Sequence, residues 1–408
     1  MNPDLNKLQP YPFERLNALK AGITPPADRS PIALSIGEPK HPAPDAVRET
    51  LSDNLNLLSS YPSTKGVPEL RSAIADWATR RFQLSQGIDP ETQVLPCTGT
   101  REALFAITQA LLDRSQAQPL VVCPNPFYQI YEGAAYLAGA EPYFLNCLAD
   151  NEFLADFDAV PAEIWQRCQL LFICSPGNPT GAVLGLAALQ KLINLAERYD
   201  FVIAADECYS EIYFDEDQPP VGLLQACSKM GRHDYRRCLV FHSLSKRSNL
   251  PGLRSGFVAG DSELISKFLL FRTYHGCAMP IYSQLASITA WNDEQHVIEN
   301  RDKYRAKFEA VLQVLDGVMR VSRPDAGFYL WAETPIDDQD FARQLYAHEN
   351  ISVLPGSFLS RECEGINPGK NRIRMALVAP LEDCIIAAER LARFVHSLSP
   401  ATQSDAIR

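Results

Sequence analysis

From about residue 66 onward, short apolar runs alternate with longer segments of helical character. This alternation is typical of β–α units that wind around a parallel sheet, so the pattern predicts an α/β fold. A further apolar run at residues 256–260 is bracketed by glycines, which makes it a candidate antiparallel strand. The five main predicted strands cover residues 93–95, 120–122, 170–173, 201–204 and 239–241.

Each main predicted strand is followed directly by a polar or glycine-bearing cluster. Open α/β sheets bind their ligands outside the carboxyl ends of the strands. Because all five clusters fall at such ends, they predict one shared site. The clusters cover residues 98–101, 124–128, 175–181, 206–209 and 243–246.

The rest of the chain predicts a second, smaller α+β domain. Residues 281–316 lack proline and glycine and repeat apolar positions at helical spacing, with Asn292 or Asp293 able to cap a second helix. We expect a large domain over residues 49–285, and a small domain made of residues 286–408 together with a proline-rich N-terminal arm, residues 1–48. The predicted strands of the small domain lie within residues 327–331, 351–354 and 372–377. The tail at 399–408 is expected to fray.

Composition narrows the class of protein. A chain of 408 residues is long enough for two domains, and a net charge of −11 argues against a general nucleic-acid binder. The eleven cysteines include no Cys-x-x-Cys pair and no histidine cluster at metal-ligand spacing, which predicts reduced thiols, no metal site and a cytoplasmic location. The N-terminus lacks the apolar region of a signal peptide, and no apolar stretch approaches the ~20 residues of a membrane span.

Lys246 lies in the most informative stretch of the chain. It follows a predicted strand, and Ser243 and Arg254 flank it within the sequence SLSKRSNLPGLRSG. This arrangement is expected of a lysine that forms a Schiff base with pyridoxal phosphate, with Ser243 and Arg254 as phosphate ligands. The ordinary alternative is a solvated surface lysine, which the surrounding motif disfavours.

Two further clusters offer partners for such a cofactor. Thr98, Gly99 and Thr100 open a predicted helix, whose N-terminus can bind the phosphate, although many helix starts bind nothing. Asp206 ends a buried apolar run, where a carboxylate is costly unless it is paired. The pyridine nitrogen is its natural partner; an aspartate that starts a turn is the alternative.

Polar side chains beside these clusters complete the predicted site. Asn178 and Tyr209 can hydrogen-bond the phenolic oxygen of the cofactor, and Tyr128 can stack on its ring, although plain packing also explains Tyr128. Arg372 and Arg374 alternate with apolar residues and therefore share one strand face. One of them can clamp a substrate carboxylate; two surface arginines on an edge strand are the alternative.

Together these motifs resemble the class I/II pyridoxal-phosphate aminotransferases of fold type I, over nearly the whole chain from about residue 34. Ser-Leu-Ser-Lys with Pro-Gly-Leu-Arg-Ser-Gly, Asn-Pro-Thr-Gly at 178–181 and Asp-Glu-Cys-Tyr at 206–209 carry the resemblance. It implies a large domain with a mostly parallel seven-stranded sheet sandwiched by helices, a smaller α+β domain, and a homodimer with active sites at the interface.

The resemblance also assigns roles to single positions. It implies that Gly37 contacts the substrate and that Tyr61 reaches the partner subunit's cofactor phosphate. Arg372 matches the family's arginine for the substrate α-carboxylate better than Arg374 does. Arg374 is then free to bind a distal group of the substrate. Arg101 stands where some members have a small residue, so the entrance is expected to be more basic.

Within the family, residues 37–44 and 371–377 resemble the N-succinyl-L,L-diaminopimelate aminotransferases of lysine biosynthesis. The expected reaction is transamination with 2-oxoglutarate, in which Lys246 is Schiff-base lysine and proton carrier, assisted by Asp206 and Tyr209. Partners are then small amino and keto acids, without nucleic acid or membrane. The alternatives are an aminotransferase for aspartate, alanine or aromatic amino acids, a pyridoxal-dependent C–S β-lyase, and, more remotely, a non-catalytic regulatory domain.

Overall fold

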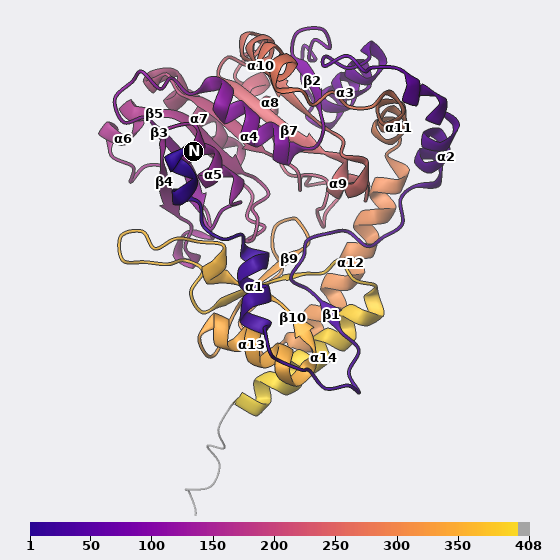
Figure 1. The fold of residues 1–408 in the computed structure, drawn as a ribbon, viewed down its shortest axis with the longest axis vertical. Helices are drawn as coiled ribbons and strands as arrows, with labels where there is room; N and C mark the ends of the chain where they lie inside the picture. The colour runs from indigo at the N-terminus through magenta and orange to yellow at the C-terminus, as the bar shows by residue number, and fades with distance from the viewer. Residues whose placement is uncertain (399–408) are drawn as a thin grey trace, which may run out of the picture.

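The computed structural model describes residues 1–398 and is built around a seven-stranded sheet of order β2-β8-β7-β6-β5-β3-β4 (Figure 1). The five main predicted strands are present, and β8 runs antiparallel to both neighbours, as the glycine-bracketed run predicted. The strands are β2 (Val94–Cys97), β3 (Leu120–Asn125), β4 (Glu141–Asn146), β5 (Cys168–Cys174), β6 (Val202–Asp206), β7 (Cys238–Ser243) and β8 (Gly256–Gly260).

Strand β4 was missed in the sequence. It lies at the edge of the sheet, pairs only with β3, and leaves most of its side chains partly exposed. An edge strand needs no continuous apolar run, so the signal that revealed the central strands is weak here.

Helices cover both faces of this sheet, with one apolar core on each side. Beyond the sheet-covering helices, the large unit includes α6 (Ala162–Arg167) and α9 (Leu244–Arg247). The core with α4 (Thr100–Leu111), α5 (Ile130–Leu137) and α10 (Ser262–His275) lies on one side; α3 (Pro68–Arg81), α7 (Leu186–Tyr199), α8 (Leu223–Lys229) and α11 (Ile281–Asn292) contribute to the other.

A separate core belongs to the smaller unit at the bottom of Figure 1. Its three-stranded sheet has the order β11-β12-β9. The N-terminal arm joins the unit through a separate two-stranded sheet, in which β1 pairs with β10. The strands are β1 (Ile32–Ala33), β9 (Tyr329–Glu333), β10 (Ile351–Ser352), β11 (Leu354–Pro355) and β12 (Arg372–Ala376); the helices are α1 (Pro12–Lys20), α12 (Gln295–Leu315), α13 (Asp338–Glu349) and α14 (Leu381–Leu398).

Helices lie across both predicted boundaries between the two units. The expected break between two helices is present, since α11 ends at Asn292 and the Asp293 carboxylate accepts a hydrogen bond from the Gln295 amide at 2.8 Å. Helices α2 (Asp45–Asp53) and α11 straddle positions 48/49 and 285/286, yet they pack in the large-domain core through Val47 and Trp291. We therefore propose boundaries before α2 and between α11 and α12.

All eleven cysteines are free, and seven of them are buried, as expected of reduced structural thiols. Within residues 1–398 no helix is long and apolar enough to cross a membrane. The expectation of a frayed tail at 399–408 lies outside the described residues.

Candidate active site

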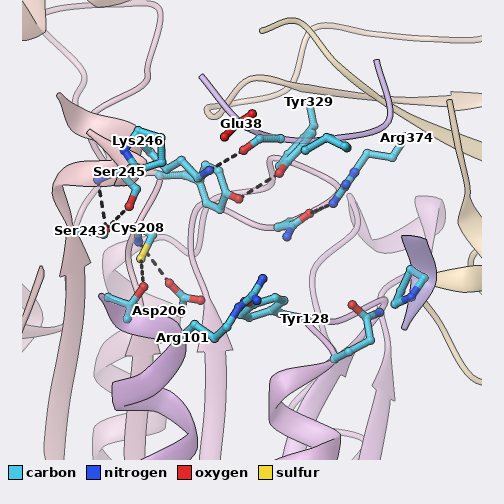
Figure 2. Close-up of a pocket in the computed structure, with 18 of the residues that line it drawn as sticks. Glu38, Arg101, Tyr128, Asp206, Cys208, Ser243, Ser245, Lys246, Tyr329 and Arg374 are labelled. Atoms are coloured by element: carbon cyan, nitrogen blue, oxygen red, sulfur yellow. Dashed lines mark hydrogen bonds between the residues drawn. The ribbon is translucent and has the colours of Figure 1, made fainter. Parts of the chain in front are cut away.

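The strand-end clusters line one cavity of about 420 Å³ between the large sheet and the small unit. Lys246 and Arg374 reach into this cavity from opposite sides (Figure 2). The predicted site residues that line the cavity are Gly37, Thr100, Tyr128, Asn178, Asp206, Tyr209, Ser243, Lys246, Arg254 and Arg374. The structure therefore brings together residues that are more than 300 positions apart in the sequence.

Lys246 is presented by the single turn of α9, directly after β7. Its Nζ donates a hydrogen bond to the Gly37 carbonyl and lies 5.4 Å from the centre of the Phe328 ring. Burial lowers the pKa of Lys246 from 10.5 to about 8, because the charged form loses hydration. A much larger fraction of this amine is neutral near pH 7 to 8 than for a solvated lysine, and the neutral amine is the nucleophilic form.

An anion cradle lies beside this lysine. Helix α4 begins at Thr100 and points its N-terminus at the cavity, with Gly99 at φ +91° just before it. The positive φ favours glycine at this position, and a Cβ at Gly99 would also displace the guanidinium of Arg254. The Arg254 Nη1 donates to the Pro251 carbonyl at 2.9 Å, which holds the group in place.

The serines of the lysine motif complete the cradle. Ser243 Oγ accepts from the Ser245 amide at 3.1 Å and lies 2.9 Å from Ser245 Oγ, and both serines line the cavity. Thr98 and Gly99 are not among the lining residues; the Thr98 hydroxyl instead donates to the Glu102 carboxylate at 3.0 Å. The structure thus brings Thr100 to the cavity and turns the Thr98 side chain away.

Asp206 ends β6 as a buried carboxylate with only neutral donors around it. Its Oδ2 accepts from the Tyr131 hydroxyl at 2.8 Å and its Oδ1 from the Cys208 amide at 3.3 Å. Burial raises the pKa of Asp206 above its ordinary value. Among residues 1–398 no lysine, arginine or histidine forms an ion pair with it. A cation in the cavity would stabilise the charged form.

Arg374 is a buried cation in the same cavity. It is 4% exposed, and it donates to Asn178 Oδ1 at 2.9 Å and to the Ser35 carbonyl at 2.8 Å. Its Nε has no hydrogen-bond partner, and within the described residues no carboxylate pairs with it. A buried guanidinium with a free donor calls for an anionic ligand, because an unpaired buried charge is costly.

Arg372, which the resemblance favours over Arg374 as the α-carboxylate arginine, lies outside the cavity lining. The two arginines share a strand face, but two residues along a strand correspond to about 7 Å. Arg372 is opposite Glu333 in the sheet, pairs with that carboxylate at 2.7 Å, and is absent from the cavity lining. The Glu333 carboxylate neutralises the charge of Arg372 outside the cavity.

Two aromatic hydroxyls and one arginine shape the mouth of the cavity. Arg101 donates from Nε to the Tyr128 hydroxyl at 2.6 Å and from Nη2 to the Tyr11 hydroxyl at 3.2 Å. No carboxylate among residues 1–398 pairs with Arg101, so its charge is available at the entrance. Arg101 is exposed and lines the cavity beside Tyr128, which is the placement that a basic entrance requires.

Tyr61 lies outside the cavity. Its side chain is fully exposed, at 101% of its reference area. The predicted contact with a partner subunit's cofactor stays a prediction, as does the homodimer.

Several cavity residues were missed in the sequence. Tyr329 lies 3.1 Å, hydroxyl to hydroxyl, from Tyr209, and Cys208 Sγ lies 3.1 Å from the Thr100 hydroxyl. Ser245 and Cys208 sit inside motifs already identified, so their positions offered a signal. Tyr11 and Tyr329 follow no strand end of the large sheet, and nothing in the local sequence distinguishes them from packing residues.

Comparison with known proteins gives a consistent result. The family model for aminotransferase class I and II matches residues 29–391. The LL-diaminopimelate aminotransferase of Aquifex aeolicus (strain VF5) is 32% identical over 394 residues, which cover 95% of this chain and 97% of the relative.

Solved structures agree over the same length. An aminotransferase from Neisseria meningitidis Z2491 superposes with a TM-score of 0.92 at 50% identity, covering 97% of this chain and 100% of that one. A probable N-succinyldiaminopimelate aminotransferase from Thermus thermophilus gives a TM-score of 0.82 at 25% identity, covering 94% of this chain and 99% of that one.

Proposed function

The chain belongs to the class I and II aminotransferases, and on that premise we propose that it moves an amino group from N-succinyl-L,L-diaminopimelate to 2-oxoglutarate. The family uses pyridoxal 5′-phosphate, and relatives named LL-diaminopimelate aminotransferase support a donor of the diaminopimelate class. The choice of the N-succinylated donor rests on the charges that line the cavity.

The residues present fit the cofactor. The α4 N-terminus with Thr100, Ser243, Ser245 and Arg254 would hold the phosphate, and the buried Asp206, which has no cationic partner among the described residues, would hold the protonated ring nitrogen. Asn178 and Tyr209 would face the phenolic oxygen, and Lys246 would supply the amine that attaches it. When bound, the cofactor withdraws electrons from the substrate Cα.

The protein's own groups then perform binding and proton transfer. Arg374 clamps the α-carboxylate of the donor, with Asn178 orienting the guanidinium through its Oδ1. Lys246 Nζ would accept the proton from the substrate Cα and deliver it to the cofactor's C4′ carbon, and a pKa of about 8 suits an amine that does both near neutral pH. The negative charge of Asp206 would stabilise the protonated ring nitrogen of the cofactor.

Three arginines line the cavity without a carboxylate partner among the described residues, and Arg254 is assigned to the cofactor phosphate. The observation that carries the donor assignment is the remaining pair, Arg374 and Arg101. Arg374 lies deep and Arg101 lies at the mouth, so a donor with carboxylates at both ends matches both charges. Glu38 also lines the mouth, and its carboxylate is the natural partner for the distal ammonium of an unblocked donor. Lys40 already pairs with that carboxylate at 2.5 Å. N-succinylation blocks that ammonium and adds a carboxylate, which suits this cationic entrance.

Arg101→Ala is expected to lower kcat/KM for N-succinyl-L,L-diaminopimelate by about 10- to 100-fold, because a charge-assisted hydrogen bond of roughly 1.5–3 kcal/mol is lost. The measurement is steady-state transamination with 2-oxoglutarate. L-Alanine, which has no distal group, serves as the control donor, and its rate should change less than about threefold. Arg101→Lys, the matched variant, should recover part of the loss. Equal losses for both donors would contradict distal recognition by Arg101.

A further inference from the structure

A strap of residues 35–43 crosses the cavity from the small unit to α2. It follows Leu34, whose amide donates to the Ser352 carbonyl at 2.8 Å, and it supplies Ile36, Gly37 and Glu38 to the cavity lining. Within residues 1–398 its backbone makes no hydrogen bond to other backbone groups. The strap is therefore held by side chains, and the position of the Gly37 carbonyl against Lys246 depends on them.

His41 is the strap's anchor at the end remote from the small sheet. Its Nδ1 lies 2.7 Å from Asn300 Oδ1, and its Nε2 lies 2.7 Å from Lys307 Nζ; both partners come from α12. A lysine ammonium has only donors, so Nε2 accepts and Nδ1–H donates to Asn300. Both ring nitrogens of a neutral His41 are thereby satisfied.

The surroundings keep this ring neutral. Burial lowers the pKa of His41 to about 4, and the nearby cations Lys307 and Lys303 act in the same direction. Lys307 is itself 2% exposed, and burial lowers its pKa to about 8. No carboxylate pairs with Lys307 in the described part of the chain; it also donates to the Val378 carbonyl at 3.4 Å.

Two contacts connect this cluster to the catalytic lysine. Asn300 Oδ1 also accepts from Asn249 Nδ2 at 3.0 Å, and Asn249 is three residues after Lys246. The Tyr304 ring lies 4.9 Å from the His41 ring and 5.5 Å from the Phe328 ring, which in turn faces the Lys246 amine. The cluster thus touches both the strap and the segment that carries Lys246.

We infer that His41, held by Lys307 and Asn300, is a positioning residue that fixes the strap over the donor site. Pro39 restricts the chain between the anchor and the cavity, and Pro42 restricts the backbone of His41 itself, so fixing His41 limits the freedom of Gly37 and Glu38. Loss of the anchor should therefore weaken donor binding more than it slows the chemical step. The kinetic part of this inference rests on the proposed function.

The first test is independent of any substrate. Trypsin cleavage after Lys40, an exposed residue within the strap, should be about tenfold faster in His41→Ala than in the native protein, because local release controls access to the bond. His348→Ala, an exposed histidine of α13, is the control and should leave this rate unchanged. An unchanged rate in His41→Ala would overturn the anchoring role.

The second test asks whether His41 and Lys307 act as one unit. His41→Ala should raise KM for the donor about tenfold with kcat within about threefold, and His41→Gln, which keeps an acceptor for Lys307, should recover most of the loss. Lys307→Met keeps the apolar stem, and the double variant should be no worse than His41→Ala alone. Additive losses, or a fall in kcat alone, would overturn the inference. Faster cleavage after Lys40 in His41→Ala, together with no turnover of the proposed donor by the native protein, would support the anchoring role of His41 and contradict the proposed donor.

Discussion

Lys246→Ala is expected to lower kcat by about 10⁴-fold or more, because the variant loses both the attaching amine and the group that moves the Cα proton. No other amine replaces it: among the cavity residues Lys246 is the sole lysine in the described part of the chain. The measurement is transamination of saturating donor with 2-oxoglutarate.

The control for this variant is cofactor binding. The phosphate cradle and Asp206 do not depend on the lysine side chain, so Lys246→Ala should still retain pyridoxal phosphate through dialysis. Lys246→Arg keeps a positive charge but offers no neutral amine near pH 8, and it should be as inactive as the alanine variant. Turnover within tenfold of the native rate in either variant would contradict the role given to Lys246.

Arg374→Ala is expected to lower kcat/KM for the donor by about 100- to 1000-fold, whereas Arg372→Ala should change it by less than about threefold. The difference follows from their surroundings. Arg374 is buried in the cavity without a carboxylate partner among residues 1–398, and Arg372 is neutralised by Glu333 outside the cavity. Steady-state kinetics of the two alanine variants, measured side by side, check this contrast.

Arg374→Lys adds a matched comparison. A lysine keeps the charge but cannot offer the planar, two-pronged donor set, so most of the loss should remain. Equal losses for Arg372→Ala and Arg374→Ala, or a larger loss for Arg372→Ala, would restore the preference suggested by the sequence and contradict the carboxylate clamp proposed for Arg374.

The sequence revealed the features that local patterns determine. Central strands of a parallel sheet are buried on both faces, so their apolar runs stand out, and the polar cluster after each one marks a strand end. Lys246, Asp206 and Asn178 were found in this way, and the structure places all three at one cavity. The antiparallel course of β8 was visible from its flanking glycines.

Long-range contacts account for what the sequence did not reveal. Alternation along β12 predicts that Arg372 and Arg374 share a face, but only the register with β9 shows that Glu333 lies opposite Arg372. Tyr131 supports Asp206 from a helix 75 positions away in the chain, and His41 meets Lys307 across 266 positions. No local periodicity encodes such pairs.

The most direct test of the proposed function is the ratio of kcat/KM for N-succinyl-L,L-diaminopimelate to that for unblocked L,L-diaminopimelate, each with 2-oxoglutarate as acceptor. The cationic mouth, where Lys40 neutralises Glu38, predicts a preference of at least about tenfold for the succinylated donor, equivalent to one charge-assisted contact. N-acetylornithine and aspartate, assayed alongside, should be poorer still. A ratio below one, or better turnover of aspartate or of an aromatic amino acid, would contradict the assignment.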